Sequence, residues 1–153
     1  MRESLKSRLT RIVFGFMPCY RRTGVKVVFL SADMHEARIK LPLNWKTRGY
    51  NGTLFGGSMY ACIDPVYMTL LSLLLGRDYL VWDKSATIDF RKPGRAPLFS
   101  SFRLDPADVQ RIRTELETAE RVERTYGVEL VDAEGTPYAI FTKTIVVRRR
   151  KLA

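Results

Sequence analysis

The segment from Phe55 to Gly76, FGGSMYACIDPVYMTLLSLLLG, constrains the fold more than any other part of this 153-residue chain. It has the composition of a buried apolar helix, yet Asp64 and Pro65 stand near its middle. A carboxylate in apolar surroundings costs several kcal/mol unless a partner offsets its burial. An interior proline bends a helix at a cost of about 3 kcal/mol. We therefore expect a core helix that is kinked at Asp64-Pro65, with a polar notch at the kink.

The segments on either side of this helix show the patterns of strands and turns. A turn at residues 31–34 joins the first two strands into a hairpin, and Asp105 followed by Pro106 indicates the start of a short, solvated helix that runs to about Ala119. The expected strands are residues 24–31, 35–43, 78–92, 96–104, 121–132 and 135–150. No repeat or linker divides the chain, so we expect one domain over residues 1–153.

A helix that is apolar nearly all round must be buried on most sides. An antiparallel sheet curled around it, with a second copy of the chain over the remainder, would provide that burial. The order of elements is a helix, two strands, the long apolar helix, and four strands with a short helix inserted. We therefore expect an α+β protein of hotdog architecture, with a homo-oligomer as the working form.

The first residues form a separate feature, an amphipathic helix within residues 1–18 that Pro18 should end. Basic residues alternate with an apolar set at helical spacing, and two interpretations remain open. Either the apolar side packs on the domain, or it lies on a membrane surface. The apolar set is Leu5, Leu9, Ile12, Val13 and Phe16.

Charge and cysteine content limit the possible partners. Lys and Arg total 26 against 16 acidic residues, a net charge of +10 that suits nucleic acid, an anionic membrane or a phosphate-bearing small molecule. There is no nucleic-acid recognition motif, so we expect no nucleic-acid partner. Cys19, Cys62 and His35 form no metal-binding pattern, and we expect no metal and no cofactor. Nothing indicates secretion, which makes a cytoplasmic protein the working expectation.

Two stretches carry a family resemblance. GTLFGGSMYACIDP, residues 52–65, and GRDYLVWDKSATIDFRKPG, residues 76–94, resemble the hotdog-fold acyl-CoA thioesterase superfamily, and the likeness extends over roughly residues 20–148. The first stretch is similar to the GTxHGG segment of the phenylacetate-pathway type, in which a carboxylate follows the second glycine by seven residues; counted from Gly57, that position is Asp64. The most similar branch is one labelled only as a domain of unknown function.

The resemblance implies a catalytic carboxylate, Asp64, that faces the glycine-rich helix start of a partner subunit. The backbone at Gly56 and Gly57 would then polarise the thioester carbonyl. Two positions depart from the family pattern, because Phe55 replaces the histidine and Gly49 replaces an Asn. Asn51 is the candidate substitute for that Asn.

The remaining site candidates follow from residue type and place. Arg91 and Lys92 flank a turn and would bind the phosphates of coenzyme A. Tyr60, Tyr67 and Met68 are candidates for the core or for the acyl tunnel. Strand alternation should place Asp83 on the face opposite Trp82 and Lys84.

Together these features favour an acyl-CoA thioesterase for medium or long acyl chains, active as a dimer or a dimer of dimers. Asp64 would act as general base or as nucleophile. The alternative is a non-catalytic acyl-CoA or lipid binding protein of the same fold. In that case Asp64 would only stabilise the kink.

Overall fold

The computed structural model describes residues 2–150; residue 1 and residues 151–153 of the expected domain lie outside the described residues. The elements, in chain order, are α1 (Leu5–Phe16), α2 (Pro18–Arg21), β1 (Lys26–Leu30), β2 (Glu36–Leu41), α3 (Gly56–Ile63), α4 (Val66–Leu75), β3 (Tyr79–Phe90), β4 (Leu98–Arg103), α5 (Pro106–Glu115), β5 (Arg121–Val131) and β6 (Pro137–Arg149). The long apolar segment is thus two helices that meet at Asp64 and Pro65, which confirms the predicted kink.

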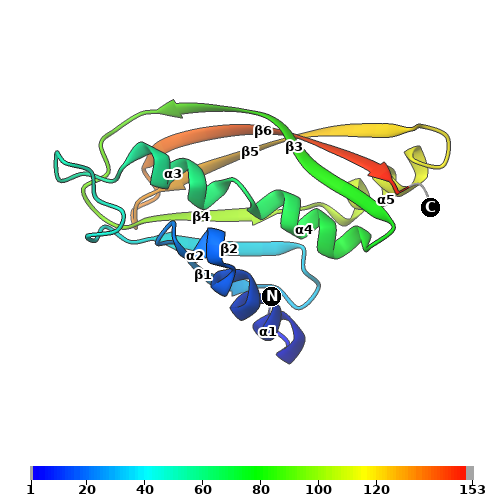
Figure 1. The fold of residues 1–153 in the computed structure, drawn as a ribbon, viewed down its shortest axis with the longest axis horizontal. Coiled ribbons are helices and arrows are strands. Elements are labelled where there is room, and N and C mark those ends of the chain that lie inside the picture. Colours follow the sequence, from blue (N-terminus) through cyan, green and yellow to red (C-terminus); the bar gives the residue numbers. More distant parts are fainter. Residues whose placement is uncertain (1, 151–153) are drawn as a thin grey trace.

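The six strands form one antiparallel sheet in the order β1-β2-β4-β5-β6-β3. Figure 1 shows the sheet curving around α3 and α4, with β3, β5 and β6 on one side of the helices and β2 and β4 on the other. The strand order leaves β3 and β1 at the two edges. This is the α+β arrangement that the sequence predicts.

Helices α3 and α4 carry the centre of the core. By length and composition alone, Gly56–Leu75 would suffice to cross a membrane. In the structure the segment instead packs against the inward faces of the strands, and Cys62, Ile63, Val66 and Leu71 are fully buried. That burial is what a core helix of a wrapped sheet requires.

The sheet is open between β4 and β5, which pair only at Phe99 and Val131. Tyr67 of α4 reaches into this opening, where its hydroxyl donates a hydrogen bond of 3.1 Å to the Gly127 carbonyl of β5. This hydrogen bond from a helix side chain therefore replaces part of the backbone hydrogen bonding that is missing between β4 and β5.

Helix α1 contradicts the first of its two interpretations. Its apolar set does not pack on the domain, because Leu5, Val13 and Phe16 are 77%, 67% and 63% exposed. The side that meets the domain is the opposite one, where Ser7 and Phe14 are buried and Phe14 stacks on Tyr20 at 4.6 Å between ring centroids. One aromatic contact, rather than the apolar stripe, decides which way the helix faces.

Two short helical regions also differ from expectation. Pro18 opens a further helix, α2, because proline suits a first helical position as well as it suits a helix end. Helix α5 ends at Glu115 and not near Ala119. It is also less solvated than its charges suggest, since Val109 and Ile112 are buried against the core.

Candidate active site

A buried lysine marks the polar centre of the fold. Lys143 of β6 stands in the inward-facing row that includes Phe141 and Ile145, and its side chain is 1% exposed. Its ammonium donates hydrogen bonds to the Asp64 carbonyl and, at 2.8 Å, to Asp64 Oδ1. It also lies 3.0 Å from Asp83 Oδ2. One cation from the sheet thus joins two carboxylates at the helix kink.

The kink itself is held by side chains from other elements. Pro65 has no N–H group, so the regular helical bond to the Ala61 carbonyl is lost there. The next carbonyl, that of Cys62, accepts a hydrogen bond of 2.8 Å from the buried Tyr20 hydroxyl. The Asp64 carbonyl accepts a hydrogen bond from the Lys143 ammonium. These two hydrogen bonds fix the backbone position from which the Asp64 side chain extends.

Asp83 reaches the same centre from β3, beside a bulge between Asp83 and Ser85. Burial raises the pKa of Asp83; the Lys143 ammonium opposes that shift and the nearby Asp64 charge adds to it. Within residues 2–150, its second oxygen, Oδ1, is buried without a hydrogen-bond partner. Lys84 instead forms an exposed pair with Glu123 at 2.8 Å, so Asp83 and Lys84 point to different sides as predicted.

Asp64 is the most exposed member of this cluster, with a side chain that is 38% exposed against 23% for Asp83. Tyr60 precedes it by one helical turn. Hydrogen bonding to Asp64, together with burial, raises the pKa of Tyr60 to about 12. The carboxylate is therefore partly open to solvent although Lys143 of the sheet holds it, and a phenol lies beside it.

The start of α3 forms a second part of the site. The first intrahelical bond runs from the Met59 N–H to the Phe55 carbonyl at 3.1 Å, so the N–H groups before it are free to bind an oxygen atom. A Cβ on Gly57 would clash with the ring of Phe55, and one on Gly56 would lie 3.4 Å from the ring of Phe90. The two glycines therefore let two exposed aromatic rings lie against the helix start.

A cleft of about 340 Å³ opens beside these glycines. It gathers four of the residues that the sequence singled out, which are Asn51, Gly56, Arg91 and Lys92. The Asn51 side chain is engaged locally, since its Oδ1 accepts a hydrogen bond of 2.8 Å from the Thr53 hydroxyl. Asp64 does not line this cleft, because about two helical turns, or ~10 Å, separate it from Gly57.

Tyr67 and Met68 lie further along, on α4. Tyr67 is buried in the core, where its ring stacks on Tyr126 with centroids 4.8 Å apart. Met68 is half-buried. The structure thus places neither residue in the cleft of Asn51 and Arg91.

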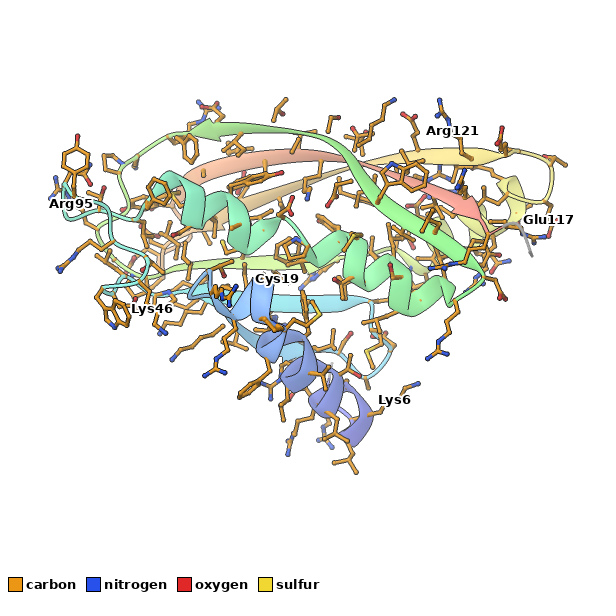
Figure 2. The ribbon with its side chains drawn as sticks, viewed as in Figure 1. Lys6, Cys19, Lys46, Arg95, Glu117 and Arg121 are labelled. Atoms are coloured by element: carbon orange, nitrogen blue, oxygen red, sulfur yellow. The ribbon has the colours of Figure 1, made fainter. Side chains whose placement is uncertain are left out.

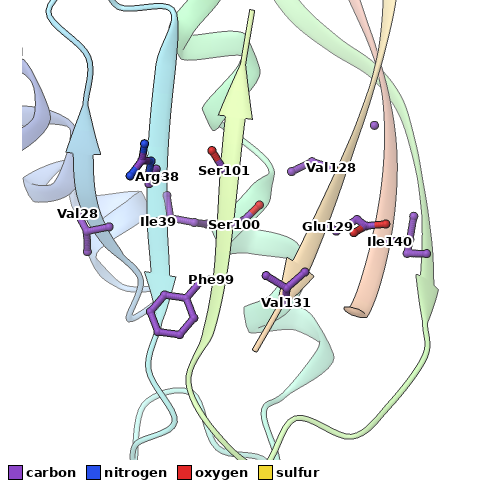
Figure 3. Close-up of a pocket in the computed structure, with 11 residues that line it drawn as sticks. Val28, Arg38, Ile39, Phe99, Ser100, Ser101, Val128, Glu129, Val131 and Ile140 are labelled. Atoms are coloured by element: carbon purple, nitrogen blue, oxygen red, sulfur yellow. The ribbon is translucent and has the colours of Figure 1, made fainter. Parts of the chain in front are cut away.

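A larger cavity, of about 660 Å³, lies elsewhere, on the outer face of the sheet. Figure 3 shows it over the opening between β4 and β5, with Arg38, Ser101 and Glu129 around it. Its other lining residues are Val28, Ile39, Phe99, Ser100, Gly127, Val128, Val131 and Ile140. None of the residues that the sequence singled out for the site lines it, so size alone does not locate the chemistry.

Lys143 is the site residue that the sequence analysis missed. The signal was present in AIFTKTIVV, residues 139–147, where strand alternation places Lys143 in one row with Ala139, Phe141, Ile145 and Val147. A lysine in such a row must be paired, because an unpaired buried ammonium is too costly. Its partners were not visible, since Asp64 and Asp83 lie far from it in sequence.

Solved structures similar to this chain share its fold at low sequence identity. The protein PA5026 of Pseudomonas aeruginosa, described as of unknown function and a probable thioesterase, superposes with a TM-score of 0.85 at 18% identity, over 98% of this chain and 100% of that one. The thioesterase HI1161 of Haemophilus influenzae gives 0.71 at 12% identity, over 96% and 93%. The PaaI protein of the E. coli phenylacetic acid degradation operon gives 0.64 at 14% identity, over 94% and 92%.

These neighbours are thioesterase-like hotdog proteins, which confirms the predicted hotdog fold. No curated protein matched the sequence. Residues 6–147 match a family described as "Domain of unknown function (DUF4442)". That match covers most of the chain and agrees with the predicted branch. The chain therefore belongs to the DUF4442 family and folds as a hotdog protein.

Proposed function

We propose that this protein is a cytoplasmic acyl-CoA thioesterase in which Asp64 activates the attacking water. The observation that carries the proposal is the position of Asp64. Its carboxylate is 38% exposed, yet it is fixed at a helix kink by the buried ammonium of Lys143 at 2.8 Å. A carboxylate that is both held and reachable meets the geometric requirement for a general base.

The reaction needs few protein groups. Asp64 takes a proton from water while the water oxygen attacks the thioester carbonyl carbon. The resulting oxyanion is stabilised by the free N–H groups at the start of α3, at Gly56 and Gly57. The carbon–sulfur bond then breaks, and the thiolate leaves and takes up a proton to give free coenzyme A and the carboxylic acid.

Two copies of the chain are needed to bring these groups together. Asp64 and Gly57 of one subunit are ~10 Å apart along the helix. A partner subunit whose helix start faces Asp64 would supply the oxyanion donors. Exposed apolar side chains on the uncovered side of this region support such a partner; they are Phe55, Tyr60, Leu73 and Phe90. We therefore propose a dimer, or a dimer of dimers, as the active form.

The cleft of Asn51 and Gly56 is the proposed place for coenzyme A. Arg91 and Lys92 line it and carry the positive charge that phosphates require. The acyl chain would run from there along the apolar side of α3 and α4, past Tyr60 and Met68. The length of that path favours medium or long chains.

A second function, acyl-CoA binding without hydrolysis, is favoured by one specific contact. The ammonium of Lys143 holds Asp64 Oδ1 at 2.8 Å, which is the geometry of a structural ion pair at the helix kink. Phe55 also stands where the resembling enzymes carry a histidine. Turnover measurements separate the two functions.

The test is thiol release across an acyl-CoA length series, with Asp64→Asn as the main variant. We expect kcat to fall about 10²–10⁴-fold while the oligomer stays intact. Asp78→Asn, a change of the same chemistry at an exposed residue, is the matched control and should behave as wild type. Equal rates in Asp64→Asn and wild type would refute the role of Asp64. Tight binding without turnover in wild type would establish the binding function.

A second experiment tests the arrangement across subunits. Gly57→Trp should block the helix start, and Asp64→Asn should remove the base. If the site is shared, mixing the two inactive proteins under exchange conditions should restore part of the activity. In a mixed dimer, one of the two sites then combines the intact Gly57 of one subunit with the intact Asp64 of the other. No recovery in mixed oligomers would place the whole site within one subunit.

A further inference from the structure

Helix α1 presents its apolar side outward. At about 100° per residue, Leu5, Leu9 and Val13 share one arc of about 100° with Ile12 and Phe16. All five side chains are exposed, between 45% and 77%. Figure 1 shows α1 projecting from the body near β1, away from α3 and α4. Contiguous exposed apolar residues of this kind mark a surface that a membrane or another molecule covers.

The opposite side of α1 is firmly attached to the body. Phe14 stacks on Tyr20. The Arg11 guanidinium pairs with Glu3 at 2.8 Å and donates to the Val27 carbonyl of β1 at 3.3 Å. Because this side is occupied, the helix cannot bury its apolar arc by rolling over without losing these contacts. The outward orientation is a property of the fold.

Basic residues surround the apolar arc. On the helical projection Lys6 follows one border of the arc and Arg8 the other, and both side chains are exposed. Arg2, Arg21, Arg22 and Lys26 add exposed positive charge before and after the helix. Two acidic residues lie in this region: Glu3, which pairs with Arg11 at 2.8 Å and with Arg8 at 3.8 Å, and the exposed Asp33, next to the hydrogen bond from the Ala32 N–H to the Arg2 carbonyl.

The charges decide what covers the arc. A second copy of α1 would bring like charges together, and the protein as a whole carries +10. An anionic lipid surface offers the opposite charge at the headgroups and an apolar phase directly below them. We propose that α1 is a peripheral membrane-docking helix, which inserts Leu5, Leu9, Val13 and Phe16 among the acyl chains of an anionic bilayer while Lys6 and Arg8 contact the headgroups.

The docking helix is connected to the kink. Phe14 of α1 packs on Tyr20, and the Tyr20 hydroxyl holds the Cys62 carbonyl two residues before Asp64. A membrane-bound α1 would therefore sit at a fixed place relative to the kink. The docking proposal is independent of turnover, because its readout is binding to lipid.

The experiment is co-sedimentation of the full-length protein with vesicles of phosphatidylcholine alone or mixed with phosphatidylglycerol. We expect binding to the mixed vesicles that weakens in high salt. Leu9→Ser with Val13→Ser should lower the partition coefficient by about tenfold or more. Lys6→Glu should lower it about tenfold, on mixed vesicles only.

Two controls match these variants. Tyr50→Ser also removes an exposed apolar side chain, but in the loop that precedes α3. Arg121→Glu reverses one charge on β5, and Figure 2 shows Arg121 and Lys6 on opposite sides of the molecule. Both should bind as wild type. Circular dichroism and elution volume report whether each variant is folded and how it associates.

Three results would overturn the proposal. The first is no wild-type binding to mixed vesicles at low salt. The second is unchanged binding by the Leu9→Ser, Val13→Ser variant. The third is a change of elution volume in that variant without a loss of vesicle binding, which would assign the apolar arc to contact between copies.

Discussion

The Lys143 ammonium lies 2.8 Å from Asp64 Oδ1 and also holds the Asp64 carbonyl, so one side chain of the sheet fixes both the backbone and the carboxylate at the helix kink. Asp83 shares the same ammonium at 3.0 Å. The polar notch in the apolar core is therefore a three-residue cluster rather than a lone aspartate.

Removal of Lys143 should be costly. Lys143→Met keeps the volume and leaves two carboxylates unpaired, and we expect a loss of about 2–4 kcal/mol in the free energy of unfolding, below the usual range for buried pairs because Asp64 is partly exposed. Urea unfolding measures it. The control is Lys84→Met, which breaks the exposed pair with Glu123 and should leave the free energy of unfolding close to that of wild type. Similar losses in the two variants would contradict a special role for Lys143.

Tyr67→Phe should affect stability and not substrate affinity. The hydroxyl donates to the carbonyl of the exposed residue Gly127 in the opening between β4 and β5, and loss of this part-buried hydrogen bond should cost about 0.5–1.5 kcal/mol in the free energy of unfolding. The Michaelis constant for acyl-CoA should stay as in wild type. A raised Michaelis constant at unchanged stability would instead place Tyr67 in the acyl path.

Asp108 of α5 should make stability depend on acid pH. Burial raises the pKa of Asp108, but hydrogen bonds from Tyr126, Arg124 and Arg111 outweigh burial and leave it below its ordinary value of 3.8. Because the folded state holds this proton less tightly than the unfolded state, its contribution is full above that value and is lost as pH falls below it.

The variant Asp108→Asn tests this sign. We expect it to be less stable than wild type by about 1–2 kcal/mol at neutral pH. The difference should shrink as pH falls below about 4. Chemical unfolding of both proteins across this range gives the difference directly. A gap that stays constant down to acid pH would show that packing, not ionisation, is lost in the variant.

Tyr20→Phe should loosen the kink locally. It removes the 2.8 Å bond to the Cys62 carbonyl and keeps the ring stacked on Phe14. We expect a loss of about 1–2 kcal/mol and faster amide hydrogen exchange around residues 62–69 than in wild type. Exchange should stay unchanged in β5, which is remote from the bond. Uniformly faster exchange would indicate global destabilisation instead.

Local patterns were sufficient for most of the secondary structure. Alternation located the six strands, and Pro65 located the helix kink, because both depend on short-range geometry. The glycines before α3 and the basic turn at Arg91 were likewise readable as candidates, and the structure brings Gly56, Asn51 and Arg91 to one cleft. Asp64 was found through its unusual surroundings in sequence.

What the sequence by itself determined is therefore most of the elements, the kink and a set of candidate site residues. Only the tertiary structure decided their partners. The pairing of Lys143 with Asp64 joins residues 79 positions apart, and the outward turn of α1 follows from the Phe14–Tyr20 stack. Neither feature has a local signature in the sequence. Periodicity shows which face of an element is apolar, but it does not show which distant side chain that face contacts or whether it faces solvent.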